Sequence, residues 1–163
     1  MPILSKILGL INGTNTVPED KTLGVDVSHW QGPIDWHMMR SNGVRWGITK
    51  ATDIGWDGKG FVDKRAVINH TLMAQEGILT GAYCWLDPRT DPYYQAKFFL
   101  DNFYSRYTTD FPPVLDFEDS NVNSWSDMLW RAQTWLAYVE QETDQRPMVY
   151  TSPGFMRHFD RRK

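Results

Sequence analysis

The stretch PPVLDFED, residues 112–119, joins a continuous apolar run to two acidic side chains, Asp116 and Glu118. The apolar run predicts a buried strand over 112–118, and residues two apart on a strand project from the same face, roughly 6.5–7 Å apart along the backbone. Burying a carboxylate is costly unless something compensates it. We therefore expect this strand to present both acids together at a functional edge, with Phe117 turned the opposite way.

Four similar apolar runs flank this stretch, and helical segments separate them. The apolar runs predict further strands over 23–28, 44–51, 78–86 and 146–152. Apolar spacing, with capping and stop residues, predicts helices over 34–43, 61–76, 91–107 and 124–142, and a short helix after Pro153. Five strand–helix units with near-continuous apolar strands predict an α/β fold in which helices cover a parallel sheet.

Polar or aromatic residues close each predicted strand. In parallel α/β folds the functional residues gather at the carboxyl ends of the strands, so we expect these side chains to converge on one rim. They are Asp26, Ser28, Lys50, Thr52, Tyr83, Trp85, Asp116, Glu118, Tyr150 and Ser152.

The two acids of the central strand suggest a chemistry. Neighbouring carboxylates resist ionising together, so the pair is expected to hold one proton more tightly than usual. A proton-holding acid beside an ionised carboxylate is what cleavage of a glycosidic bond requires. Two other readings stay open: the acids are salt-bridge partners or helix caps, or a hard cation binds to Asp26, Asp116 and Glu118.

Length and composition narrow the function classes. The chain has 163 residues, enough for one domain with a sizeable core, and a net charge of −3, which argues against nucleic acid as a partner. Aromatic residues make up 14% of the chain and include eight Trp. Because an indole face packs well on the C–H face of a sugar, we expect at least two of these Trp to contact carbohydrate.

The first 22 residues are expected to form an N-terminal extension and linker, with the domain over 23–163. The apolar segment MPILSKILGLIN, residues 1–12, is too short to span a bilayer and lacks a convincing signal-peptide cleavage site. A membrane role is therefore not expected.

Four blocks of the chain resemble successive blocks of the glycoside hydrolase family 25 lysozymes, the Chalaropsis-type N-acetylmuramidases common among phage endolysins and bacterial autolysins. The blocks are GVDVSHWQGPIDW (24–36), the segment from GVRWGITKATDIG to GAYCWL (43–86), PPVLDFED (112–119) and RPMVYTSPGF (146–155). The resemblance implies an irregular (β/α) TIM-like barrel whose groove binds peptidoglycan glycan strands. It also implies hydrolysis of the β-1,4 bond between N-acetylmuramic acid and N-acetylglucosamine.

Matched residue by residue, the resemblance implies roles for the rim. Glu118 takes the place of the general acid, Asp116 that of its partner, and Asp26 that of the first-strand aspartate. Asp116 either attacks the anomeric carbon or orients the substrate's own acetamido group as the nucleophile. No metal or other cofactor is implied, and the expected substrate-binding residues are Tyr83, Trp85, Tyr150, Asp53 and Lys50.

The sequence departs from the family pattern at three places. Cys84 stands where the family usually has His, and Asp53 where Glu is usual. The chain ends at Lys163, after five recognisable strands, without the closing strands and the late aspartate of the family. We therefore expect an incomplete barrel: either the chain is truncated, or self-association or a partner chain completes it, or residues 1–12 cover the gap.

These features together predict a peptidoglycan hydrolase, with bacterial glycan strands as its partner. In the absence of a signal peptide we expect a phage-encoded protein, made in the host cytoplasm or carried on the virion, that acts on the cell wall. The alternative is a catalytically weak or inactive glycan-binding or structural protein of a phage or cell wall, built on a lysozyme scaffold.

Overall fold

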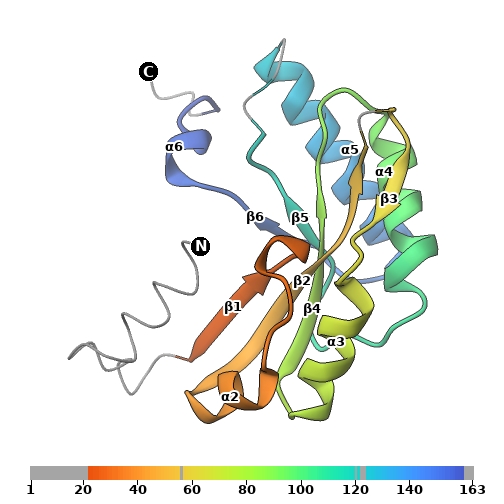
Figure 1. Ribbon diagram of the computed structural model, residues 1–163. Coiled ribbons are helices and arrows are strands. Elements are labelled where there is room, and N and C mark those ends of the chain that lie inside the picture. Colours follow the sequence, from red (N-terminus) through yellow and green to blue (C-terminus); the bar gives the residue numbers. More distant parts are fainter. Residues whose placement is uncertain (1–21, 56, 120, 122–123, 160–163) are drawn as a thin grey trace.

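One curled sheet organises the protein. The computed structural model describes residues 22–55, 57–119, 121 and 124–159. Its strands are β1 (Leu23–Val27), β2 (Val44–Ile54), β3 (Gly60–Val62), β4 (Leu79–Trp85), β5 (Val114–Asp116) and β6 (Met148–Tyr150). The order is β1-β2-β4-β5-β6 with parallel neighbours, and β3 pairs antiparallel with β2. The predicted α/β class and the incomplete, irregular barrel are thereby confirmed (Figure 1).

The helices lie mostly on one face of this sheet. They are α2 (Trp36–Ser41), α3 (Ala66–Gln75), α4 (Pro92–Phe99), α5 (Trp125–Thr143) and α6 (Pro153–Met156). A 3₁₀ turn, η1 (His29–Gln31), follows β1, and a π-helical turn, η2 (Leu100–Tyr104), continues α4. Figure 1 shows α3, α4 and α5 along one face; the opposite face, which none of these three helices covers, is here called the open face.

The predicted helix boundaries follow from capping residues. Asp35 accepts a hydrogen bond from the Met38 amide (2.8 Å), and Asp91 accepts one from the Tyr94 amide (2.9 Å). Ser124 caps α5 in the same way, since its hydroxyl accepts from the Asp127 amide at 3.3 Å. Each of these side chains satisfies an amide that the first helical turn leaves unpaired.

The structure departs from the sequence-based predictions most clearly in two regions. Residues 52–54 extend β2 and pair antiparallel with residues 60–62 of β3 where a loop was predicted, and the predicted helix over 61–76 therefore begins only at Ala66. The Gly55 amide closes the turn on the Lys59 carbonyl (2.8 Å). The central strand β5 also ends at Asp116, not at residue 118.

The core lies between the sheet and the helices that cover it. Sheet residues such as Ala51, Cys84 and Leu115 pack there against Phe99 and Trp135 of the helices. A smaller cluster joins β1 to α2 and α3 through residues that include Val25, Trp36 and Met73. Because side chains alternate along a strand, burial of one set leaves the other set on the open face.

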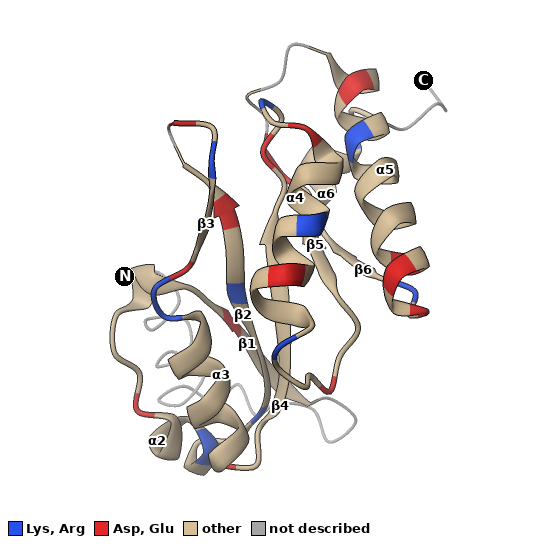
Figure 2. Cartoon of the chain, turned by 90° about the vertical axis from the view of Figure 1, so that its right-hand side faces the viewer, with Lys and Arg blue, Asp and Glu red and all other residues tan. Residues whose placement is uncertain are grey.

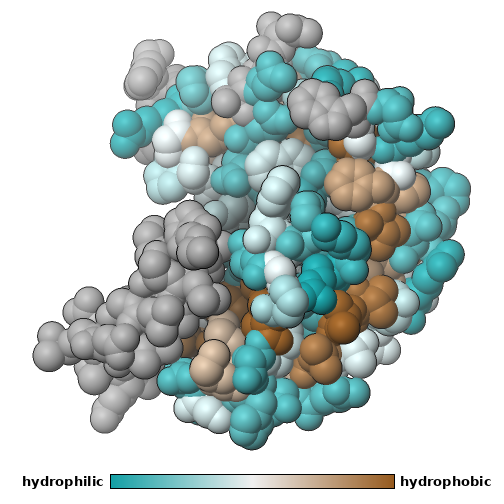
Figure 3. Space-filling model, viewed as in Figure 1, coloured by the Kyte–Doolittle hydropathy of each residue, from teal (hydrophilic) through white to brown (hydrophobic). Residues whose placement is uncertain are grey.

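The surface carries both signs of charge. Figure 2 shows Lys and Arg interspersed with Asp and Glu on the α4 and α5 side. Figure 3 shows mostly hydrophilic side chains on the face seen in Figure 1, with hydrophobic ones gathered in smaller groups. Among the described residues, no helix combines the length and the apolar character needed to cross a bilayer.

Candidate active site

Strand register brings the predicted rim residues onto the open face. Asp116 lies opposite Trp85 of β4 and Tyr150 of β6, while Lys50 lies opposite Tyr83. Paired residues on neighbouring strands share a face of the sheet. A small hollow of about 40 Å³ opens between these strands, and its lining consists of Asp26, Ile48, Tyr83, Val114, Asp116 and Tyr150.

Asp116 is the most deeply buried acid of this hollow. Its side chain is only 6% exposed, and its Oδ1 has no hydrogen-bond partner among the described residues. Burial, followed by the nearby charge of Glu118, raises the pKa of Asp116 to about 8, with further increases from Asp26 and Asp53 and an opposing effect of Lys50 included in this value. Asp116 therefore keeps its proton at neutral pH in the free protein.

Glu118 lies beyond the end of β5, where the sequence predicted continuing strand. The Asp116 carbonyl accepts from the Leu86 amide (3.0 Å), and the Phe117 amide donates to the Tyr150 carbonyl (2.9 Å), so the ladder holds the backbone up to Phe117. Glu118 itself is half-buried, and burial followed by the Asp26 charge raises its pKa.

The Phe117 ring lies on the core side of the sheet. It is buried in the core, with ring centroids 4.9 Å from Phe155 and 5.3 Å from Phe159. Phe117 therefore points away from the hollow, as its place between the two acids predicted.

The pKa values agree with the expectation that this pair holds a proton tightly, but the proton is distributed differently from what the resemblance implies. Both pKa values are raised, and the value of about 8 belongs to Asp116 rather than to Glu118. Both acids therefore hold a proton more tightly than free carboxyl groups do, and the titration belongs to the pair.

Two tyrosines and a third acid complete the hollow. Burial raises the pKa of Tyr83, and the charges of Asp116 and Asp26 add to the shift. Burial, then Glu118, Asp26 and Asp116, raise the pKa of Tyr150. Asp26 and Asp116 act on both phenols, and Glu118 acts on Tyr150 and Asp116. These two tyrosines and three acids therefore form one electrostatic cluster. Tyr150 is 49% exposed and Asp26 is exposed, so both are open to a ligand.

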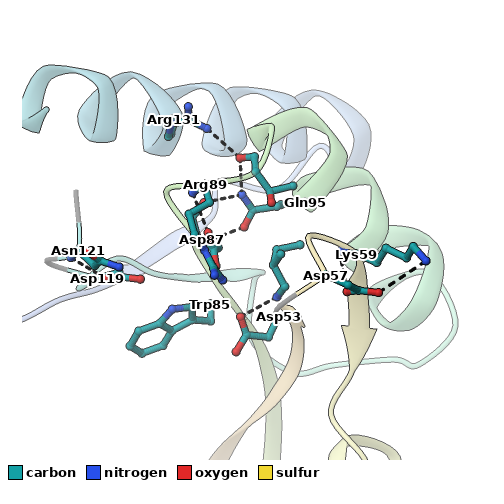
Figure 4. Close-up of polar contacts among 12 residues, drawn as sticks. Asp53, Asp57, Lys59, Trp85, Asp87, Arg89, Gln95, Asp119, Asn121 and Arg131 are labelled. Atoms are coloured by element: carbon teal, nitrogen blue, oxygen red, sulfur yellow. Dashed lines mark hydrogen bonds and ion pairs between the residues drawn. The ribbon is translucent and has the colours of Figure 1, made fainter. Parts of the chain in front are cut away.

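A larger groove borders this cluster. It has a volume of about 360 Å³ and is lined by His29, Trp30, Lys50, Asp53, Ile54, Gly55, Phe61, Trp85, Asp87, Arg89 and Asp119. Three predicted substrate-binding residues meet here: Lys50 forms an ion pair with Asp53, and its ammonium lies 5.3 Å from the Trp85 ring centroid. Figure 4 shows Asp53, Trp85 and Asp87 approaching a common space.

Neighbouring helices fix the loop that follows β4 beside this groove. Arg89 forms an ion pair with the buried carboxylate of Asp87. The Gln95 side chain accepts from the Asp87 amide (2.9 Å) and donates to the Asp87 carbonyl (2.8 Å), and Arg131 of α5 donates to the Thr90 carbonyl (2.8 Å) (Figure 4). These contacts fix the backbone of the loop that forms this wall of the groove.

Several groove residues did not emerge from the sequence as candidates. They are His29, Trp30, Phe61, Asp87, Arg89 and Asp119. Most of them follow a strand directly, so a wider reading of the rim rule would have included them. Phe61 depends instead on the unpredicted β2–β3 hairpin.

Two remaining expectations concern metal ligands and Cys84. In the described ranges, no three His, Cys, Asp or Glu side chains are grouped so that they could hold a metal ion, and the reading of Asp26, Asp116 and Glu118 as a cation site gains no support. Cys84 is buried in the core, where burial raises the pKa of its thiol to about 12. Its replacement of a histidine therefore changes the core side of β4 and leaves the groove side unaltered.

Known proteins share this arrangement. The sequence model of the glycosyl hydrolases family 25 matches residues 25–163. The chain is 36% identical over 146 residues to the uncharacterized protein YegX of Escherichia coli K12, which covers 85% of this chain and 52% of YegX. It is 30% identical over 161 residues to Lysozyme M1 of Streptomyces globisporus, covering 88% and 53% of the two chains.

Solved structures agree with the sequence comparisons. A bacterial lysozyme from Streptomyces coelicolor superposes with a TM-score of 0.73 at 29% identity, over 86% of this chain and 67% of that one. A family 25 glycosyl hydrolase from Bacillus anthracis superposes with a TM-score of 0.76 at 24% identity, over 87% and 65%, and supports the fold. The chain therefore belongs to glycosyl hydrolase family 25. It spans about half the length of the curated relatives it matches.

Proposed function

We propose that this chain carries the acid pair of a lysozyme-type peptidoglycan hydrolase, which cleaves the β-1,4 bond between N-acetylmuramic acid and N-acetylglucosamine. The observation that carries the proposal is the hollow in which the buried Asp116 lies with Tyr83 and Tyr150, close enough to Glu118 for the Glu118 charge to raise the pKa of Asp116. Membership of family 25 and the similarity to Lysozyme M1 support the same reaction class.

Glu118 is the proposed general acid and base. It is half-buried at the end of the anchored segment, and the Asp26 charge helps it to keep a proton. In the first step its proton moves to the glycosidic oxygen as the bond to the anomeric carbon breaks. In the second step the Glu118 carboxylate removes a proton from the attacking water and so returns to its starting state.

Asp116 is proposed to orient the acetamido group of the substrate. Asp116 lines the hollow, so a carboxylate oxygen of this residue would accept a hydrogen bond from the acetamido N–H, whose carbonyl oxygen then attacks the anomeric carbon and forms a cyclic intermediate that water reopens. A donor at this oxygen favours the ionised form of Asp116, which leaves the shared proton on Glu118 where the reaction needs it.

The test is loss of turbidity of a bacterial wall suspension, together with release of new reducing ends. We expect the wild type to clear the suspension and Glu118→Gln to be slower by at least about 100-fold, the lower end of what positioned general acids contribute. The matched control is Glu142→Gln, the same change at an exposed position on α5, which should clear like the wild type.

The outcomes separate the two candidate functions. Equal clearing by wild type and Glu118→Gln contradicts the catalytic assignment. Wall binding without clearing by the wild type favours the glycan-binding alternative over hydrolysis.

A further inference from the structure

The Trp30 side chain is the most exposed large apolar group among the described residues, at 80%. It lies on η1, immediately after the carboxyl end of β1, and lines the groove that also contains Lys50 and Trp85. Burying an exposed indole against the flat apolar face of a ligand is favourable, because it removes apolar surface from water.

A buried carboxylate holds the turn that carries Trp30. The Asp63 side chain is fully buried, and its Oδ2 accepts hydrogen bonds from the His29 amide (3.1 Å) and from His29 Nδ1 (2.6 Å). Its Oδ1 accepts from the Arg65 amide (2.8 Å). Because an ionised carboxylate only accepts, the proton of this ring contact is assigned to His29 Nδ1.

The same turn is fixed at both of its ends. At its start, the Ser28 hydroxyl accepts from the Trp30 amide (3.3 Å), and the Gln31 side chain accepts from the Ser28 amide (2.7 Å). At its end, Arg65 Nε donates to the Gly32 carbonyl (3.1 Å). Side chains of four residues, Asp63, Ser28, Gln31 and Arg65, therefore hold the backbone around Trp30, while its indole is exposed.

The His29 ring, which Asp63 holds in place, packs against the Trp30 indole. The two ring centroids are 4.5 Å apart with planes tilted by 35°, so the imidazole backs the indole. His29 also lines the groove, on the side where Asp63 holds it. A buried acid, an imidazole and an exposed indole thus form a chain of contacts that ends at the groove.

We propose that Trp30 is a sugar-stacking platform of the groove and that Asp63 and His29 are its positioning residues. This inference rests on the proposed function, because its ligand is a sugar ring of the same glycan strand. Trp30 would contribute to binding equally in the ground and transition states, since it touches no reacting atom. Replacing it should raise KM and leave kcat nearly unchanged.

The test measures binding of a tetrasaccharide of alternating N-acetylglucosamine and N-acetylmuramic acid by calorimetry. All variants are made in the Glu118→Gln background, which prevents hydrolysis. We expect Trp30→Ala to raise Kd about three- to tenfold and Trp30→Phe to raise it less, because Phe keeps part of the stacking face. The control Trp130→Ala removes another exposed indole, on α5 and outside the groove, and should leave Kd unchanged.

The positioning role is tested by a double-mutant cycle. Asp63→Asn should weaken binding when Trp30 is present and add little in the Trp30→Ala background, because both changes remove the same platform. His29→Ala is the second variant, used if Asp63→Asn lowers the melting temperature enough to disturb the measurement. Equal effects of these changes in both backgrounds overturn the positioning role.

Two results distinguish this inference from the proposed function. If the Glu118→Gln parent binds the tetrasaccharide and Trp30→Ala binds it equally well, the platform is wrong and the hydrolase proposal stands. If the parent does not bind it, both proposals are overturned.

Discussion

Asp116 and Phe117 are adjacent in the chain but lie on opposite sides of the sheet. Asp116 lines the hollow on the open face, whereas the Phe117 ring packs in the core against Phe155. The backbone between the two acids of the site is therefore anchored by an aromatic side chain. Glu118 directly follows Phe117 in the chain, so its position depends on how Phe117 packs in the core.

This anchoring predicts the effect of Phe117→Ala. Removal of a buried ring should lower the free energy of unfolding by about 3–5 kcal/mol, measured by urea denaturation. At a low temperature, where the variant is fully folded, wall clearing per folded molecule should also fall, because Glu118 loses the support of the neighbouring ring. Met38→Ala, which changes an exposed side chain, should alter the free energy of unfolding by under about 0.5 kcal/mol. Full activity in folded Phe117→Ala would show that Glu118 is held by other contacts.

Burial of Asp116 predicts that Asp116→Asn is more stable than the wild type at neutral pH. The folded pKa of about 8 lies above the ordinary value, so the folded protein binds a proton that the unfolded chain has released between roughly pH 4 and 8, and wild-type stability falls as pH rises through this window. The amide never ionises and avoids this loss. We expect a gain of about 1–2 kcal/mol at pH 7.5 and almost none at pH 4, with strongly reduced turnover at both.

Urea denaturation at the two pH values checks this prediction. The control is Asp101→Asn, which changes an exposed acid on η2 and should show no comparable dependence on pH. A variant that is less stable than the wild type at pH 7.5 would mean that Asp116 is ionised and paired in the folded protein.

The shared proton predicts a bell-shaped dependence of kcat/KM on pH. The alkaline limb should lie near pH 8, where the pair loses its last proton, and the acid limb above the ordinary pKa of a Glu side chain, where a second proton binds. Asp26 raises the pKa of both acids, so Asp26→Asn should move both limbs to lower pH. Rates of reducing-end release across this range provide the measurement, and an unshifted profile in Asp26→Asn contradicts the electrostatic coupling.

Much of this arrangement was predictable from residue patterns alone. Continuous apolar strands separated by capped helices predicted the parallel sheet, and the rule that parallel strands deliver function at their carboxyl ends placed Asp26, Tyr83, Asp116 and Tyr150 on one rim. The alternation along residues 114–118 also predicted the burial of Phe117.

Other features depend on tertiary contacts that no local pattern encodes. The β2–β3 hairpin was predicted as loop and helix, since residues 52–62 are rich in turn formers and pair only after folding. The Asp63–His29 contact spans 34 residues and joins the turn η1 to the residue that follows β3, and neither η1 nor β3 was predicted. The location of the proton on Asp116 follows from depth of burial, which differs between two acids of the same sequence motif.

Lys50 predicts a shift of the pH profile opposite to that of Asp26. Its ammonium pairs with Asp53 and lowers the pKa of Asp116. Lys50→Met keeps most of the side-chain volume but removes the charge, so the pKa of Asp116 should rise and the alkaline limb of kcat/KM should move to higher pH. The change also leaves Asp53 without its ion-pair partner and should lower the melting temperature.

The same rate measurements test Lys50→Met against Lys97→Met. Lys97 forms an exposed ion pair with Asp101 on the helical side of the sheet, so its replacement removes one positive charge from the molecule without touching the groove. Lys97→Met should keep the wild-type profile. An equal shift in both variants would mean that net charge, and not the position of Lys50 beside Asp116, sets the pKa of the acid pair.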